Sequence, residues 1–362
     1  MIDSKPCKTK EYFNKYLYFK RVGAYMKVYD SNMLRNIAVL GHSGCGKTNL
    51  IEAIAYTSNL TNKISKQNDK VNMTYTLGLV LVEYNNYKYN LLDTPGYFDF
   101  CGEVISSLTA SDAAIIVIDA TTDIQVGTEK SLELTEDVPK IMFINKIDNE
   151  KSRYKDTLEM LREQYGNKIV PMIIPIYKDK KFVKLHNIFE NIDELDGEFK
   201  DEAMSVKEAL MELIAETDDE ILDKYFSGEE LDAQDIQKGL TIGIQRGDII
   251  PVICGSTLNN IGTIEILDTV SKYLEPKYLD KDSTFKGFVF KTVVDPFIGK
   301  LTFVKVVAGK LTADSPVINM RTGEQERMIK MYYMCGKKQE ETKCICAGDI
   351  GAVPKLQHTN TG

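Results

Sequence analysis

The sequence lacks an excess of positive charge. Its 362 residues include 45 lysines and arginines against 53 aspartates and glutamates, which gives a formal net charge of −8 and a pI of about 5.2. Proteins that bind DNA through its phosphates rely on a basic surface. We therefore expect no DNA partner, although a local basic face could still contact RNA.

The sequence also lacks a membrane span and a secretory leader. No apolar run reaches the roughly 20 residues that a spanning helix needs, and residues 1–25 are basic and aromatic without an apolar core. The seven cysteines are scattered and odd in number, which is typical of reduced thiols. Cys344 and Cys346 are close together, but nothing near them completes a metal site, so we interpret them as strand residues. These absences predict a cytoplasmic protein with no membrane partner.

An alternation of strand and helix patterns dominates the first part of the chain. Apolar runs that predict buried strands are interleaved with helical periodicity, an order that predicts a mainly parallel sheet with right-handed crossovers. Two more strands are expected to pair through a turn at Asn85–Asn86. The fold class predicted is therefore α/β. The expected strands are 36–40, 73–82, 88–92, 113–118, 140–144 and 249–254, and the expected helices are 49–56, 102–111, 128–136, 151–165 and 263–273.

Two regions differ from this alternation. Residues 193–248 are acidic with helical periodicity, and we interpret them as an insertion because a further apolar strand follows. After Pro276 the chain becomes rich in Val, Thr, Phe and Tyr, with glycines at turn positions. That composition, with its spacing of turns, predicts a β domain of barrel type between residue 286 and the end of the chain.

The segment GHSGCGKT carries the first chemical signal. It fits the pattern G-x-x-x-x-G-K-[ST], and it lies between an expected strand and an expected helix, the context that a phosphate-binding loop requires. Lys47 would place its charge at the β- and γ-phosphates, and Thr48 would offer its hydroxyl to Mg²⁺. The whole segment is Gly41, His42, Ser43, Gly44, Cys45, Gly46, Lys47 and Thr48.

A second segment, Asp93-Thr94-Pro95-Gly96, follows the next expected strand. Asp93 at the strand end can hold Mg²⁺ through water, and the Gly96 N–H can bond a γ-phosphate. Such a loop would respond differently to a nucleoside triphosphate and a diphosphate, so we interpret it as a switch.

The third segment indicates which base is bound. Asn145-Lys146-Ile147-Asp148 follows a buried strand, and the Asp148 carboxylate can accept hydrogen bonds from both N1–H and N2 of guanine. Adenine offers no such donor pair on that edge. Gly255, Ser256 and Thr257 could add backbone contacts to the guanine oxygen. In this order the motifs favour a GTP-binding protein over an ATPase or a kinase.

With these motifs in place, the chain resembles a translational GTPase of the elongation factor G superfamily, and most of all its bacterial elongation-factor-G-like paralogues. The resemblance runs from Met26 to the C-terminus. It implies a GTPase domain over 26–275 with an α-rich inserted subdomain at about 154–249, then a β-barrel domain over 286–362. Residues 1–25 would be an N-terminal extension. The matching stretches include LRNIAVLGHSGCGKT, DTPGYFDFCGEV, VIDATTDIQVGTEK, FINKIDNE, PVICGS and GFVFKTVVDPFIGKL.

The resemblance also implies hydrolysis of GTP to GDP and phosphate, with Mg²⁺ as cofactor and the ribosome as partner. Lys47, Gly96 and Tyr97 would then be the catalytic residues. The family continues into further domains, so we expect an incomplete barrel and a product unable to support translocation.

Two departures from the family bear on hydrolysis. The first switch is short and lacks the usual arginine and glycine, which leaves Thr74 as a candidate Mg²⁺ ligand or an ordinary strand residue. Tyr97 replaces the histidine found in many relatives, although the elongation-factor-G-like subgroup also tends to have tyrosine. A phenol is a poor base at neutral pH but can orient water. His42 occurs in the family at this position, so we interpret it as structural.

The alternatives are therefore an active GTPase and a nucleotide-binding module with little or no hydrolysis. A decayed, non-functional product is a third reading, which the intact nucleotide motifs disfavour.

Overall fold

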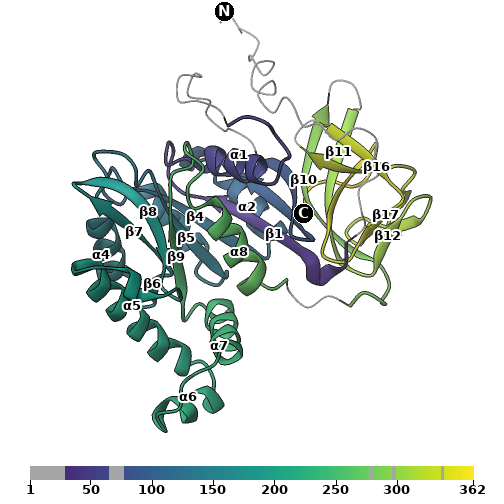
Figure 1. The fold of residues 1–362 in the computed structure, drawn as a ribbon. Helices are drawn as coiled ribbons and strands as arrows, with labels where there is room; N and C mark the ends of the chain where they lie inside the picture. Colours follow the sequence, from purple (N-terminus) through teal and green to yellow (C-terminus); the bar gives the residue numbers. More distant parts are fainter. Residues whose placement is uncertain (1–28, 65–76, 277–279, 296–298, 336–337) are drawn as a thin grey trace, which may run out of the picture.

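The computed structural model describes residues 29–64, 77–276, 280–295, 299–335 and 338–362. They form an α/β body and a β-rich body that lie side by side, with the helices α5–α7 projecting from the α/β body away from the β-rich body (Figure 1). Thr74 and residues 1–25 lie outside the described residues.

The α/β body is built on a seven-stranded sheet in the order β2-β3-β1-β4-β5-β9-β6. Every neighbouring pair is parallel except β2 and β3, which are antiparallel. This arrangement confirms the predicted α/β class. The strands are β1 (Leu34–Leu40), β2 (Gly78–Tyr84), β3 (Tyr87–Asp93), β4 (Ala113–Asp119), β5 (Lys140–Asn145), β6 (Ile169–Pro171) and β9 (Ile250–Cys254).

The predicted turn between β2 and β3 is a two-residue hairpin. Tyr84 pairs with Tyr87, and Asn85 and Asn86 take φ values of 46° and 66°. Asparagine tolerates this left-handed region better than most residues, which is why the pair suits a tight hairpin. The strand expected at 73–82 begins at Gly78 among the described residues and runs on to Tyr84.

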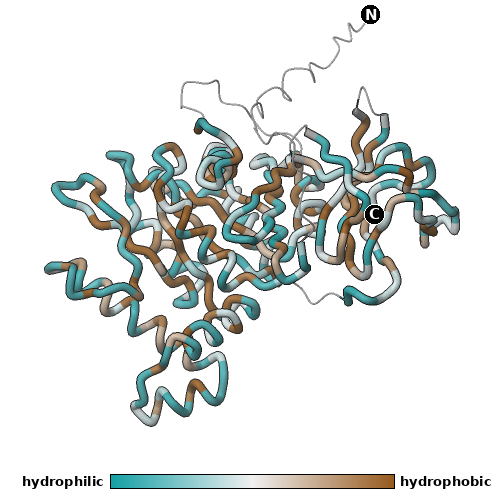
Figure 2. Tube along the Cα trace, turned by 45° about the vertical axis from the view of Figure 1, so that its right-hand side comes forward, coloured by the Kyte–Doolittle hydropathy of each residue, from teal (hydrophilic) through white to brown (hydrophobic). Residues whose placement is uncertain are grey.

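Helices and short helical turns connect these strands. They are η1 (Ser31–Met33), α1 (Lys47–Thr57), η2 (Phe98–Phe100), α2 (Cys101–Ala110), α3 (Val126–Leu134), α4 (Tyr154–Tyr165) and α8 (Thr263–Tyr273). The central strands β1, β4, β5 and β9 are buried along their whole length. Hydrophobic residues gather along these strands, and hydrophilic residues lie mostly on the outer loops and helices (Figure 2). Among the described residues no helix has the length and apolar character to cross a membrane.

The segment 154–249 is rich in helix, but it is not wholly an addition to the sheet. Ile169–Pro171 forms β6, which pairs with β9 at the edge of the main sheet. Three residues are too few to show a strand period in the sequence. The rest of the segment contains the hairpin β7 (Ile173–Lys178) and β8 (Lys181–Asn187), then η3 (Ile192–Glu194), α5 (Glu198–Ala215), α6 (Asp219–Phe226) and α7 (Ala233–Arg246).

The β-rich body contains a five-stranded antiparallel sheet in the order β10-β11-β18-β15-β16 and the two-stranded pairs β12-β17 and β13-β14. Cys344 and Cys346 lie in β17 with free thiols, as predicted for strand residues. The strands are β10 (Lys286–Asp295), β11 (Gly299–Ala308), β12 (Lys310–Thr312), β13 (Pro316–Ile318), β14 (Gln325–Arg327), β15 (Met331–Cys335), β16 (Lys338–Thr342), β17 (Cys344–Cys346) and β18 (Ile350–Pro354).

The two bodies share a buried interface. Apolar residues of both bodies, including Leu79 and Leu92 from the first and Phe290 from the second, form one cluster. Beside it, Lys88 of β3 bonds both oxygens of Asp349 at 2.7 and 2.8 Å, and their side chains are only 1% and 2% exposed. The Lys88 ammonium also lies 3.5 Å from the centre of a tyrosine ring, that of Tyr333. Burial lowers the pKa of Lys88, and the Asp349 carboxylate opposes that shift.

Replacing Lys88 with methionine should destabilise the protein strongly, because the Asp349 carboxylate would stay buried without its cation. Removing one partner of a buried pair costs about 3 kcal/mol or more. Urea unfolding followed by tyrosine fluorescence measures the loss. Lys130→Met is the control, since Lys130 pairs with Glu133 on the exposed surface and should contribute less than about 1 kcal/mol. Equal losses in the two variants would contradict the account.

Candidate functional site

The predicted nucleotide segments meet at one edge of the main sheet. The loops 41–46, 93–96, 145–148 and 255–257 follow β1, β3, β5 and β9, which are parallel strands. The carboxyl ends of parallel strands therefore bring all four loops together, and this edge is where open α/β sheets bind ligands.

Backbone geometry explains the glycines of the first loop. Gly41 and Gly46 take φ values of 136° and 107°, in a region that favours glycine. A Cβ on Gly41 would lie 2.3 Å from the Val117 carbonyl oxygen, and one on Gly46 would lie 2.2 Å from the Asn145 amide nitrogen. Neither position has room for a side chain, so the loop can close tightly between β1 and α1.

Lys47 opens helix α1 and folds back over this loop. Its ammonium donates to the carbonyl oxygens of Gly41 and His42, both at 2.8 Å, and the residue is only 6% exposed. The charge is thus held at the N-terminus of α1, where the helix dipole already favours an anion. This arrangement can bind a phosphate group.

The loop after β3 lies directly against the first loop. The Thr48 hydroxyl donates to the Asp93 carboxylate at 2.8 Å, and Thr94 donates to the Val39 carbonyl at 2.7 Å. A Cβ on Gly96 would lie 2.5 Å from the Lys47 ammonium and 2.7 Å from the backbone nitrogen of Ser43. Gly96 therefore lies directly against Lys47 and the first loop. Pro95 beside it is buried.

A hydroxyl and a buried carboxylate side by side are a donor set that fits Mg²⁺, which prefers oxygen ligands. Thr48 and Asp93 provide that pair next to Lys47. Within the described residues there is no cluster of three or more His, Cys, Asp or Glu side chains that could hold a metal by themselves. Phosphate oxygens and water would have to complete the coordination, as is usual for this ion in nucleotide sites.

Asn145 ties the third loop to the first and the fourth. Its amide nitrogen donates to the Cys45 carbonyl at 2.8 Å, and its amide oxygen accepts from the backbone N–H groups of Lys146 and Thr257 at 2.8 and 3.0 Å. Lys146 takes a φ of 66°, and its ammonium donates to the Gly44 carbonyl at 3.1 Å and to the Asp119 carboxylate. One buried asparagine thus fixes the relative positions of three loops.

Asp148 lies exposed at the rim of this assembly. Its carboxylate accepts a hydrogen bond from the Asn259 amide. The neighbouring loop 255–257 is held in place by backbone hydrogen bonds of Gly255 and Ser256. Gly255 donates to the Ile144 carbonyl at 2.9 Å and accepts from the Ile147 N–H at 3.2 Å. The carboxylate is therefore accessible to a base bound against the loop 255–257.

His42 and Cys45 have no chemical task in this geometry. A Cβ on Gly127 would lie 2.6 Å from the His42 ring, so the imidazole fills the space against α3. Burial lowers the pKa of His42, and the charge of Lys47 lowers it further. Burial raises the pKa of the Cys45 thiol, which keeps it protonated and unreactive. Tyr97, by contrast, is 37% exposed next to Gly96.

Two residues of the site were not predicted. Asp119, the last residue of β4, holds the Lys146 ammonium, and Asn259 holds Asp148. The signal for Asp119 was present, because it is an acidic residue at the carboxyl end of a buried strand. Asn259 offered none, since it lies in an ordinary polar loop.

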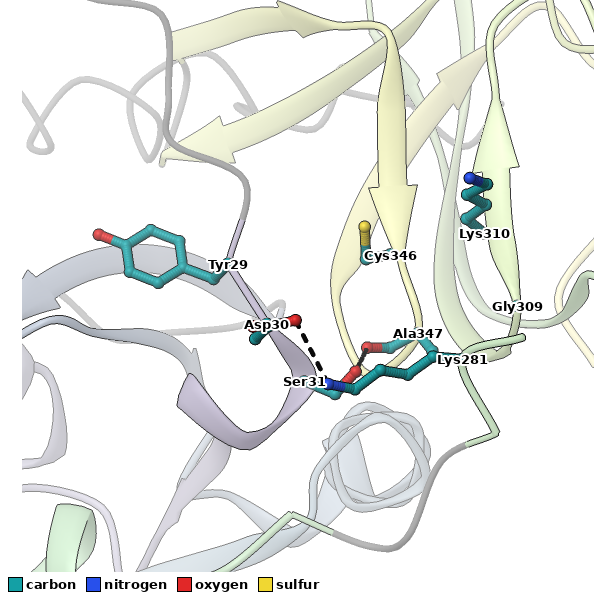
Figure 3. Close-up of a pocket in the computed structure, with 8 residues that line it drawn as sticks. All are labelled: Tyr29, Asp30, Ser31, Lys281, Gly309, Lys310, Cys346 and Ala347. Atoms are coloured by element: carbon teal, nitrogen blue, oxygen red, sulfur yellow. Dashed lines mark hydrogen bonds and ion pairs between the residues drawn. The ribbon is translucent and has the colours of Figure 1, made fainter. Parts of the chain in front are cut away.

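A separate hollow lies at the junction of the two bodies, away from the four loops (Figure 3). Two pairs of its polar groups bond to each other: Ser31 donates to the Ala347 carbonyl at 2.7 Å, and Lys281 pairs with Asp30 at 3.3 Å. We assign it no part in nucleotide binding.

Comparison with known proteins agrees with this geometry. Residues 32–276 match the family model described as elongation factor Tu GTP binding domain, and residues 284–362 match that of elongation factor G domain 2. A crystal structure of a protein from Thermus thermophilus is 28% identical and superposes with a TM-score of 0.83. The match covers 91% of this chain and 54% of that one, so the chain spans about half the length of that relative.

Proposed function

This chain belongs to the elongation factor Tu GTP-binding domain family, within the elongation factor G superfamily, and from that premise we propose that it binds GTP with Mg²⁺ and hydrolyses it to GDP and phosphate. The observation that carries the proposal is the convergence of four loops at one sheet edge. They bring together a lysine, a hydroxyl–carboxylate pair and an exposed carboxylate for guanine.

The residues around the phosphates have distinct tasks in this proposal. Lys47 neutralises the charge of the β- and γ-phosphates, and the N–H of Gly96 bonds the γ-phosphate. Tyr97 follows Gly96, where its phenol can orient the attacking water. Bound Mg²⁺ would supply charge neutralisation at the phosphate oxygens, held through Thr48 and Asp93.

The base is recognised at the other end of the site. Asp148 selects guanine, because its carboxylate can accept from both donors on that edge of the base. Asn145 and Lys146 shape the pocket through the bonds that join their loop to its neighbours.

The domain organisation we propose is a GTPase domain over 26–275, an insertion within 154–249, and a β domain over 286–362. The ribosome as partner and the cytoplasm as location are inferred from the family. Because ribosome contact normally completes such sites in this family, hydrolysis by the isolated chain should be slow.

Single-turnover GTP hydrolysis, measured with and without ribosomes, tests this proposal. We expect ribosomes to accelerate the reaction by at least about tenfold, as partner contacts can do for GTPase sites. Tight GTP binding without hydrolysis in either case would favour the alternative, a nucleotide-binding module with an incomplete catalytic site. Tyr97 would then be the first residue to replace with histidine.

A further inference from the structure

One lysine of the β-rich body contacts the switch region of the α/β body. The ammonium of Lys291, in β10, lies 2.8 Å from a carboxylate oxygen of Glu103 in α2 and 3.1 Å from the carbonyl oxygen of Leu77. The same Glu103 oxygen accepts the backbone N–H of Leu77 at 3.0 Å. Three segments that are far apart in the sequence thus meet at one cation, and we call this group of residues the Lys291 junction.

The Lys291 junction holds both flanks of the loop 93–96. On one flank, Leu77 directly precedes Gly78, and Gly78 is the cross-strand partner of Asp93. On the other flank, Glu103 lies in the first turn of α2, which follows Gly96 after the short η2 turn. A displacement of the loop at either flank would therefore change the contacts that Lys291 makes with Leu77 or Glu103.

The loop in turn lies where a terminal phosphate would be sensed. Gly96 approaches Lys47 and Ser43 so closely that no Cβ would fit between them. A γ-phosphate bound to Lys47 would contact Gly96, whereas GDP would not reach it. GTPase switches of this kind change arrangement on loss of the γ-phosphate.

The Lys291 junction lies partly buried beside a hollow, with the Glu103 side chain 30% exposed. Lys291 is only 9% exposed, and burial lowers its pKa while the Glu103 carboxylate opposes that shift. A hollow borders it, lined by residues of η2, α2 and β10 such as Phe100, Ser106 and Phe290.

A different buried ion pair across the interface, between Lys88 and Asp349, lies away from this junction. Lys88 and Asp349 join the beginning of β3 to the loop before β18, and both side chains are almost fully buried. That pair holds the bodies together but touches neither flank of the loop 93–96 directly.

We propose that Lys291 is a positioning residue for the nucleotide switch, which couples the loop 93–96 to the β-rich body through Glu103 and Leu77. The inference rests on the proposed function and extends it. Because coupling between two sites is reciprocal, a partner that holds β10 would also favour the GTP-bound loop.

The test compares GTP and GDP affinities of the full chain and its variants by titration with fluorescent nucleotides in Mg²⁺. Lys291→Met should weaken GTP binding by about fivefold or more, the range typical of site-to-site coupling, and leave GDP binding unchanged. Lys291→Arg keeps the charge and should retain the ratio of the two affinities within about twofold. Lys88→Met is the matched control, a buried interface lysine whose loss should lower stability without changing the ratio.

The outcomes separate the two proposals. If the parent binds both nucleotides and Lys291→Met leaves their ratio unchanged, the coupling is refuted while nucleotide binding stands. If Lys88→Met shifts the ratio as much as Lys291→Met does, the effect is general loosening of the interface, and the assignment to Lys291 is wrong. If the parent binds neither GTP nor GDP, both proposals fail.

Discussion

Replacing Lys47 with alanine should remove measurable GTP binding. The ammonium is held by two carbonyl oxygens of the phosphate-binding loop at the N-terminus of α1, and on nucleotide binding we expect it to turn two of its three N–H groups to phosphate oxygens. Each hydrogen bond from a charged donor contributes about 1.5–3 kcal/mol, so losing the two bonds to phosphate oxygens costs about 4 kcal/mol, roughly a thousandfold in Kd. Isothermal titration of GTP into the purified variant measures the loss.

Lys130→Ala serves as the control for this variant, because Lys130 is exposed on α3 and pairs with Glu133. It should bind GTP as the parent does. A thermal melt of both variants shows whether the fold persists, since Lys47 also satisfies two loop carbonyls. Unchanged GTP affinity in folded Lys47→Ala would overturn the assignment of the phosphate-binding loop.

Asp148→Asn should remove the preference for guanine. The carboxylate can accept from both N1–H and the 2-amino group, whereas an amide offers one acceptor and places a donor against a donor. The loss of two charge-assisted hydrogen bonds is worth about 4 kcal/mol, again roughly a thousandfold for GTP. Competition of GTP and ATP against a fluorescent nucleotide measures the change in preference.

Xanthosine triphosphate provides a positive control for the Asp148 prediction. Xanthine carries a carbonyl where guanine carries the 2-amino group, so the amide donor of the asparagine variant can pair with it. Binding of this nucleotide should therefore rise in Asp148→Asn while binding of GTP falls. An unaltered preference for GTP over ATP in the variant would show that Asp148 does not contact the base.

The features that could be predicted from the sequence are those encoded by short, contiguous stretches of residues. The first loop, the Asp93–Gly96 segment and the Asn145–Asp148 segment are contiguous motifs, and the ends of parallel strands bring them together without further information. The hairpin turn was predictable for the same reason, because two adjacent residues, Asn85 and Asn86, specify it. Buried strands such as Ala113–Asp119 were recognisable because they lack polar alternation.

The contacts between distant segments could not be predicted in this way. Lys88 lies in a strand whose alternation suggests a surface lysine, and only the packing of the β-rich body buries it against Asp349. Glu103 and Lys291 are separated by 188 positions, and neither lies in a sequence motif that would indicate a contact between them. Strand β6 is too short to leave a periodic signal. Such features depend on how the two bodies meet.

The central claim is that the four loops form a guanine nucleotide site. The most direct test is competition of unlabelled GTP and ATP for a fluorescent GTP analogue bound to the purified chain in Mg²⁺. We expect GTP to displace the analogue at a concentration at least about a hundredfold lower than ATP, as two lost hydrogen bonds to a carboxylate would require. Equal displacement by the two nucleotides, or no binding of the analogue, would contradict the claim.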